Sequence, residues 1–226
     1  MRIRLAVEDI EPNHWIAWVL DLPACYSSAG TGTDAIEHAP TKIAEYFVWL
    51  SKHDSSLPAA SEPTEIQVVE TFHSRASRED PEYIVNAFFK DDRRPLGYWE
   101  GEIALRLLDW THQDLLGVLQ SIPHKQLKKP ISGEVHGSLV GILDHIAIAE
   151  NWYFGQLGLE KGDLPGDPLE KIEVVRSNTK DQLVKLIGDV RVIKNCDEVW
   201  SGRKIVRRTL WHERDHTQQI LQLLSI

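Results

Sequence analysis

The chain has 226 residues, of which 42% are hydrophobic and 26% are charged, the composition of a soluble globular protein with one or two domains. Its net charge is −9, from 25 basic and 34 acidic residues, and this balance argues against nucleic-acid binding because proteins that bind nucleic acids usually carry a basic patch. No apolar run is long enough to cross a membrane, and acidic residues interrupt the N-terminus where a signal peptide needs an apolar core. We therefore expect a cytoplasmic protein without a membrane span, whose two distant cysteines form no disulfide framework.

The first part of the chain has the pattern of a small α/β domain. Residues 2–10 and 14–20 are β-rich and are separated by Pro12-Asn13, which predicts a hairpin. A short strand is expected at 26–28, followed by a helix at about 35–51 with Thr33 or Asp34 as its N-cap. Pro40 is expected to kink that helix or to delay its start.

The stretch WIAWVLDLPACYSSAGTGTDAIEHA resembles the HicB-like domain of certain antitoxins. That pattern has a strand, a D-L-P-G-C-like turn, a short strand, a G-x-T turn and a helix; here Ala24 stands where the glycine is usual. The resemblance implies a protein partner for this domain. A polar, Pro- and Ser-rich loop at 54–64 precedes a strand at 65–72 that could join the same sheet. The hinge-like DDRRPLG stretch predicts a domain boundary, with the HicB-like domain at 1–92.

The remainder, 93–226, reads as four amphipathic helices. They are expected at about 100–122, 138–157, 168–190 and from 201 nearly to the end, with apolar residues three or four positions apart. Four helices of this length predict a four-helix bundle, so the fold class is α+β with two domains. A homodimer is also compatible with the apolar character of these helices.

The stretch WHERDH on the last helix carries the main chemical signal. His212 and His216 are four residues apart, so on a helix their Cβ atoms lie roughly 5–6 Å from each other, close enough to share one metal ion. Both lie on the apolar stripe, where neutral imidazoles are costly unless their nitrogens find partners. His145 lies on the inward stripe of the second helix and is the expected third ligand.

The same letters match the H-E-x-x-H pattern of zinc proteases. Only TQQILQLLSI follows His216, and it contains no metal-binding side chain to serve as the downstream third ligand. Glu213 is turned about 100° from His212 on a helix, so the spacing does not make it a general base. We therefore exclude the protease interpretation.

The segments LRLLDWTHQDLLGVL, SLVGILDHIAIAENWYFGQLG and VWSGRKIVRRTLWHERDHTQQI resemble the DinB (YfiT-like) family. The resemblance covers nearly all of 97–226 and implies a four-helix bundle in which three histidines hold a divalent metal, usually zinc or nickel. Three protein ligands leave open positions, as in catalytic sites. Characterised relatives include thiol-S-transferases that use a low-molecular-weight thiol such as bacillithiol, and a mycothiol-dependent isomerase.

Two functions follow as hypotheses. The first is a metal-dependent thiol-S-transferase or related enzyme that acts on small electrophiles. The alternative is a non-enzymatic binding or regulatory protein, in which the HicB-like domain recognises a protein partner and the metal is structural. The residues that could orient a ligand or line a cavity are His112, Asp144, Glu150, Glu213 and Asp215. The remaining histidines are expected to be ordinary loop or surface residues: His14, His38, His53, His73, His124 and His136.

Overall fold

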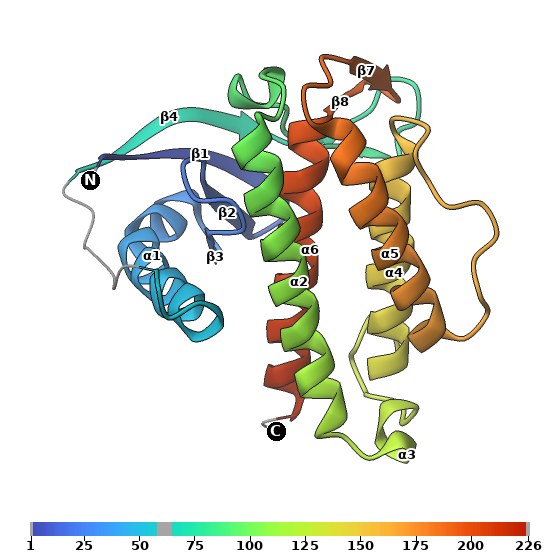
Figure 1. The fold of residues 1–226 in the computed structure, drawn as a ribbon. Coiled ribbons are helices and arrows are strands. Elements are labelled where there is room, and N and C mark those ends of the chain that lie inside the picture. Colours follow the sequence, from blue (N-terminus) through green and yellow to red (C-terminus); the bar gives the residue numbers. More distant parts are fainter. Residues whose placement is uncertain (1, 58–64, 225–226) are drawn as a thin grey trace. The chain divides into compact units, whose positions relative to one another are not determined.

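The computed structural model describes residues 2–57 and 65–224 (Figure 1). The backbone divides into an N-terminal unit, Met1–Arg93 with Lys194–Val199, and a C-terminal unit, Arg94–Ile193 with Trp200–Ile226. The first division lies next to the boundary predicted after residue 92, but the short segment 194–199 was expected in the second domain. Of the loop predicted at 54–64, residues 58–64 lie outside the described part.

The N-terminal unit is built on a mixed four-stranded sheet. Its strands are β1 (Arg2–Glu11), β2 (His14–Val19), β3 (Tyr26–Ala29) and β4 (Glu65–His73), in the order β3-β2-β1-β4. β1 pairs antiparallel with β2 and parallel with β4. The prediction that 65–72 joins the first sheet is therefore confirmed. Helix α1 (Gly32–His53) contacts β1, β2 and β3.

Helix α1 continues through Pro40, so the expected delay of its start is wrong. It begins at Gly32, three residues before the predicted start, because Thr31 caps it by accepting a hydrogen bond from the Asp34 backbone N–H. Proline removes one helical hydrogen bond. The buried face of the helix outweighs that loss, and it consists of Ala35, Ala39, Ile43 and Tyr46.

The turn between β2 and β3 contains Ala24 in the left-handed region, with φ of 66°. This conformation disfavours a side chain with a Cβ and favours glycine. The turn is held by a hydrogen bond from the Cys25 N–H to the Leu22 carbonyl (3.0 Å) and by one from the Tyr46 hydroxyl to the Pro23 carbonyl (2.7 Å). Ala24 thus occupies a position whose backbone explains why the resembling pattern has glycine.

No sequence pattern predicts four short strands, which are β5 (Arg75–Ala76), β6 (Ile84–Val85), β7 (Val192–Asn195) and β8 (Glu198–Ser201). Asp197, between β7 and β8, accepts hydrogen bonds from the Arg78 backbone N–H (3.0 Å) and from its side-chain Nε (2.9 Å). Hydrogen bonds from Arg78 and Lys194 hold the pKa of Asp197 far below its usual value. These contacts explain why 194–199 belongs to the N-terminal unit.

The described residues of the C-terminal unit include four long helices and one short one. They are α2 (Tyr98–Gln120), α3 (His124–Leu127), α4 (Leu139–Gly155), α5 (Pro168–Leu186) and α6 (Gly202–Leu224). α2 contacts α6, α6 contacts α4, α4 contacts α5, and α5 contacts α2, so the long helices close a ring (Figure 1). We call α2, α4, α5 and α6 the bundle.

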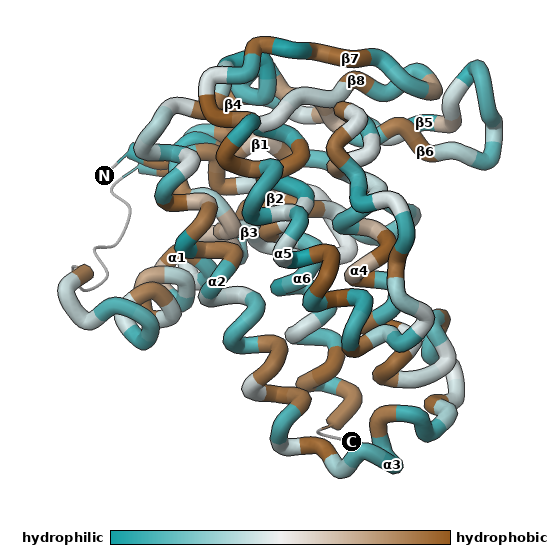
Figure 2. The backbone as a smooth tube through the Cα atoms, turned by 45° about the vertical axis from the view of Figure 1, so that its right-hand side comes forward, coloured by the Kyte–Doolittle hydropathy of each residue, from teal (hydrophilic) through white to brown (hydrophobic). Residues whose placement is uncertain are grey.

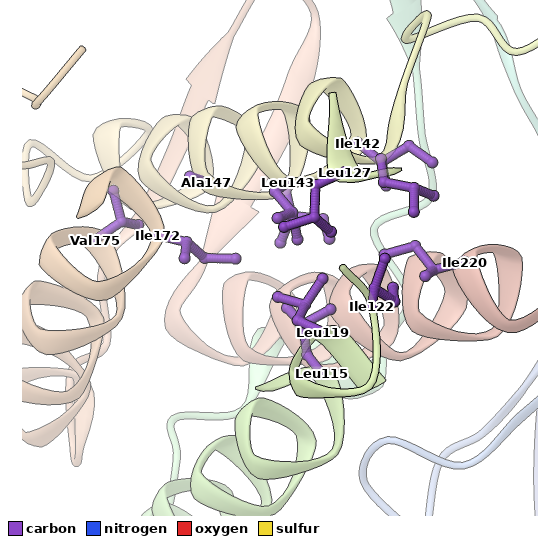
Figure 3. Packing of buried hydrophobic residues seen from close by; sticks show 12 residues of the cluster. Leu115, Leu119, Ile122, Leu127, Ile142, Leu143, Ala147, Ile172, Val175 and Ile220 are labelled. Atoms are coloured by element: carbon purple, nitrogen blue, oxygen red, sulfur yellow. The ribbon is translucent and has the colours of Figure 1, made fainter. Parts of the chain in front are cut away.

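Buried apolar side chains from α2, α3, α4, α5 and α6 pack together in the bundle (Figure 3). Apolar and polar residues alternate along its helices in Figure 2, as expected for amphipathic helices with one buried face. The buried members of this core are Leu115, Leu119, Ile122, Leu127, Leu139, Ile142, Leu143, Ile146, Ala147, Ile172, Val175 and Ile220.

The predicted helix boundaries hold within a few residues, with one clear difference. α5 ends at Leu186 rather than at Val190, and Val190 is 76% exposed. The chain turns at Gly188, whose φ is 76°. Ser138 caps α4 as predicted, by accepting a hydrogen bond from the Gly141 N–H. Among the described residues, no helix has the length and apolarity needed to cross a membrane.

Candidate metal centre

The structure brings together the three histidines that the sequence selected. α6 carries His212, which is buried, and His216, which is half-buried, and α4 carries His145, which is also half-buried. Nε2 of His212 lies 3.1 Å from Nε2 of His145 and 3.2 Å from Nε2 of His216. Ring nitrogens from two helices therefore converge on one small volume, which the i, i+4 spacing alone provides only for the pair on α6.

These separations match those of nitrogens that share one cation. With metal–nitrogen bonds of about 2.0–2.1 Å, two ligand nitrogens lie about 2.9 Å apart at a right angle and about 3.4 Å apart at the tetrahedral angle. The observed distances of 3.1 and 3.2 Å fall between these values.

Hydrogen bonds among the three imidazoles cannot satisfy the Nε2 atoms of His145, His212 and His216 at the same time. Nδ1 of His216 lies 2.6 Å from Oε1 of Gln219, an oxygen that only accepts, so Nδ1 carries the proton and Nε2 of neutral His216 offers a lone pair. A single proton on Nε2 of His212 can serve only one of its two neighbours. A divalent cation would accept all three lone pairs at once, and the donor set fits zinc or nickel.

The environment keeps the three imidazoles neutral. Burial, together with the neighbouring His136 and His216, lowers the pKa of His145 to about 4. Burial also lowers the pKa of His212 well below its usual value, and the charges of His216 and His145 add to that effect. Burial lowers the pKa of His216 as well. Neutral imidazoles are the form that binds metals, so the site is ready to act as a ligand set at neutral pH.

His136, which we had expected to be an ordinary loop residue, belongs to this cluster. Its ring stacks on that of His145, with centroids 4.1 Å apart and planes 21° apart. One ring nitrogen from each of His136, His145 and His216 lies within 4.8 Å of the others, so these three could also hold a metal ion. We use "histidine cluster" for His136, His145, His212 and His216.

Tight packing of the loop before α4 places His136. A Cβ added to Gly141 would lie 1.9 Å from the His136 carbonyl oxygen, so the loop can approach α4 only because residue 141 is glycine. Gly137 has φ of 74°, which turns the chain between His136 and the cap at Ser138. The only sequence signal for this turn was the pair of glycines at 133 and 137, and it carried no information about the histidine.

The other residues that we had considered divide into two groups. Asp144 and Asp215 flank the ligands: Asp144 accepts a hydrogen bond from Nζ of Lys171, and the charge of Asp215 opposes the lowering of the His216 pKa. Glu150, Glu213 and His112 instead join a buried ionic cluster with Arg176, which the sequence analysis missed.

Arg176 is the centre of the ionic cluster. Its Nη2 donates to Oε2 of Glu150 (2.8 Å) and to Oε2 of Glu213 (2.5 Å). Nδ1 of His112 lies 3.4 Å from Oε2 of Glu213, and its Nε2 lies 3.1 Å from Oε1 of Glu173. The cluster therefore connects all four helices of the bundle, one residue away from His212 along α6.

The two buried carboxylates differ. Burial acts to raise the pKa of Glu213, but the charge of Arg176 and the hydrogen bond with His112 outweigh burial. The pKa of Glu213 therefore lies below its ordinary value. Burial raises the pKa of Glu150 despite the charge of Arg176. Burial acts to lower the pKa of His112, but the hydrogen bond and the charge of Glu213 outweigh burial. The pKa of His112 therefore lies above its ordinary value. Glu213 is thus engaged by both Arg176 and His112.

Comparison of the chain with protein-family models, curated proteins and solved structures found no match. The HicB-like and DinB-like patterns consequently rest on the sequence motifs, and the metal centre rests on its own geometry.

Proposed function

We propose that the C-terminal unit is a metal-dependent enzyme of the DinB type, in which His145, His212 and His216 hold one divalent cation, zinc or nickel. The observation that carries this proposal is the approach of Nε2 of His212 to Nε2 of His145 (3.1 Å) and to Nε2 of His216 (3.2 Å). One proton on Nε2 of His212 can join it to only one of these neighbours, whereas a cation could bind all three nitrogens.

The reaction class that we propose is transfer of a low-molecular-weight thiol to a small electrophile. A divalent cation bound to three histidines retains positions for a further ligand and lowers the pKa of a thiol that reaches it. In the transfer, the sulfur forms a bond to the electrophilic carbon, the leaving group departs with its electron pair, and the thiol proton passes to solvent. The support for this step is the resemblance of the helical segments to a family that contains thiol-S-transferases.

The chain's own residues provide the binding and the surroundings. His212 and His145 bind from α6 and α4, so the bundle must be folded for the centre to exist. The rings of Tyr153 and His212 make a T-shaped contact, with centroids 5.8 Å apart and planes 89° apart. The ionic cluster around Arg176 joins the same helices and limits their relative movement.

Metal analysis of the 226-residue chain, purified without a histidine tag, tests the binding claim. We expect about one zinc or nickel per chain, as three-histidine sites bind with this stoichiometry. His145→Ala should lose the metal, whereas His124→Ala, an exposed histidine outside the cluster, should retain it. A wild-type metal content near zero that His145→Ala does not change would contradict the proposal.

A second measurement tests the reaction. Metal-loaded protein is mixed with a thiol, such as bacillithiol or cysteine, and a small alkylating electrophile, and the S–C product is quantified. We expect product formation that is lost on chelation, restored by zinc or nickel, and absent in His145→Ala. Full metal occupancy without any product would contradict thiol transfer and leave metal binding intact.

A further inference from the structure

A chain of hydrogen bonds links the loop before α4 to a metal-centre ligand on α6. Nδ1 of His216 lies 2.6 Å from Oε1 of Gln219, and Nε2 of Gln219 lies 3.0 Å from Oε2 of Glu134. The other oxygen of Glu134 accepts the backbone N–H of His136 at 3.1 Å. One carboxylate therefore contacts the residue that orients His216 and the backbone of the histidine that stacks on His145.

The chemistry of these groups fixes the direction of each hydrogen bond. A carboxylate only accepts, so the Gln219 atom that faces Glu134 must be the NH₂ group. The amide oxygen then faces His216, where it also only accepts, so Nδ1 of His216 must carry its proton. Without Glu134, the amide could rotate by 180° and present NH₂ to Nδ1. That arrangement would favour the other tautomer, with the proton on Nε2 in place of the lone pair that binds a metal.

We propose that Glu134 is a positioning residue for the metal centre, which holds His216 in its metal-binding tautomer through the Gln219 amide. This inference rests on the proposed function insofar as the histidines bind a cation. Second-layer partners of this kind orient ligand rings and raise their basicity. The loop supports the role, because its backbone is closed by hydrogen bonds from Ile131 N to the Gly137 carbonyl (2.8 Å) and from Gly137 N to the Glu134 carbonyl (3.0 Å).

The experiment uses the full chain with four variants: Glu134→Ala, Gln219→Ala, the double alanine variant, and Glu134→Ala combined with Gln219→Glu. The last variant places an acceptor-only group directly against Nδ1, so it should restore the tautomer without Glu134. Glu102→Ala removes an exposed glutamate on a different element, α2, and serves as the control. Long-range ¹H–¹⁵N correlation spectra of the metal-free protein report the His216 tautomer, and competition with a chromogenic chelator reports zinc affinity.

We expect Nδ1–H in the wild type and a mixture of tautomers in Glu134→Ala, with zinc affinity about 10-fold to 100-fold lower. Gln219→Ala should give the same loss, and the double alanine variant should add little, because both residues act on one proton. The Gln219→Glu rescue should return the tautomer to Nδ1–H. The tautomer is the decisive reading, since an added negative charge could by itself raise zinc affinity.

Two results would overturn the inference. One is an unchanged tautomer in Glu134→Ala. The other is a loss of zinc affinity in Glu134→Ala that adds to the loss in Gln219→Ala, together with a His216 tautomer that the Gln219→Glu exchange does not return to Nδ1–H. Glu134 would then only hold the loop. If the wild type binds no zinc or nickel, the proposed function fails, while the tautomer measurement still decides whether Glu134 sets the proton position on His216.

Discussion

Arg176 and Glu213 form an ion pair in the interior of the bundle, where their side chains are only 4% and 1% exposed. Glu150 shares the same Nη2 of Arg176 and is 3% exposed. One guanidinium therefore binds carboxyl groups from α4 and α6, next to the candidate ligand His212.

Removal of this guanidinium should strongly destabilise the protein. Arg176→Met leaves two buried carboxylates without their cation, and we expect the free energy of unfolding to fall by about 3–5 kcal/mol. Arg191→Met, which removes a partly exposed ion pair with Asp189, should cost about 1 kcal/mol or less. Urea denaturation measures both, and similar small losses for the two variants would contradict a central role for Arg176.

The metal centre should tolerate mild acid better than ordinary histidines do. With a pKa of about 4, His145 is only about 1% protonated at pH 6, whereas an unperturbed imidazole would be about 75% protonated. We expect zinc affinity to change little between pH 8 and pH 6 and to fall steeply towards pH 4. A steep loss that begins near pH 6.5 would show that the imidazoles titrate normally.

The same lowered pKa affects the stability of the metal-free protein. The unfolded chain binds a proton at His145 below about pH 6.5, and the folded chain does so only below about pH 4. Between these values the unfolded state holds more protons, so stability falls as the pH falls through this window. His145→Gln should show a smaller loss of melting temperature from pH 7 to pH 4.5 than the wild type; an equal loss would assign the effect to other groups.

Two glycines on the bundle should respond oppositely to substitution by alanine. Gly141→Ala would bring a Cβ to within 1.9 Å of the His136 carbonyl oxygen, so we expect a loss of about 1–3 kcal/mol in stability and a displaced His136. Gly117→Ala, on α2 with nothing within 4 Å of the added Cβ, should be neutral or stabilising by about 0.5–1 kcal/mol. Thermal unfolding distinguishes them, and a neutral Gly141→Ala would show that the loop can move away at little cost.

The turn of the N-terminal unit offers a stabilising substitution. Ala24 has φ of 66°, and Ala24→Gly should relieve this strain by about 1 kcal/mol, reduced by the greater freedom of glycine in the unfolded chain. Denaturation midpoints of the two proteins provide the measurement. A lower midpoint for Ala24→Gly would mean that the alanine methyl group contributes more packing than the left-handed backbone costs.

Local rules predicted most of the secondary structure. The four long helices of the bundle and the strands of the first sheet lie within a few residues of their expected positions, because apolar periodicity and caps such as Ser138 act over one or two turns. The errors arise where distant contacts decide. α1 continues through Pro40 because its apolar face is buried, and 194–199 joins the N-terminal unit because Asp197 binds Arg78.

The candidate site shows the same division. The spacing of His212 and His216 by itself determined that two imidazoles lie on one face of one helix, because a helix repeats every 3.6 residues. Only the tertiary structure decided that His145 meets them, that His136 stacks on His145, and that Arg176 lies between two carboxylates. The physical reason is that helix packing and loop closure bring together residues that are far apart in the chain. The sequence pattern of one helix does not tell how a neighbouring helix is rotated about its axis or shifted along it.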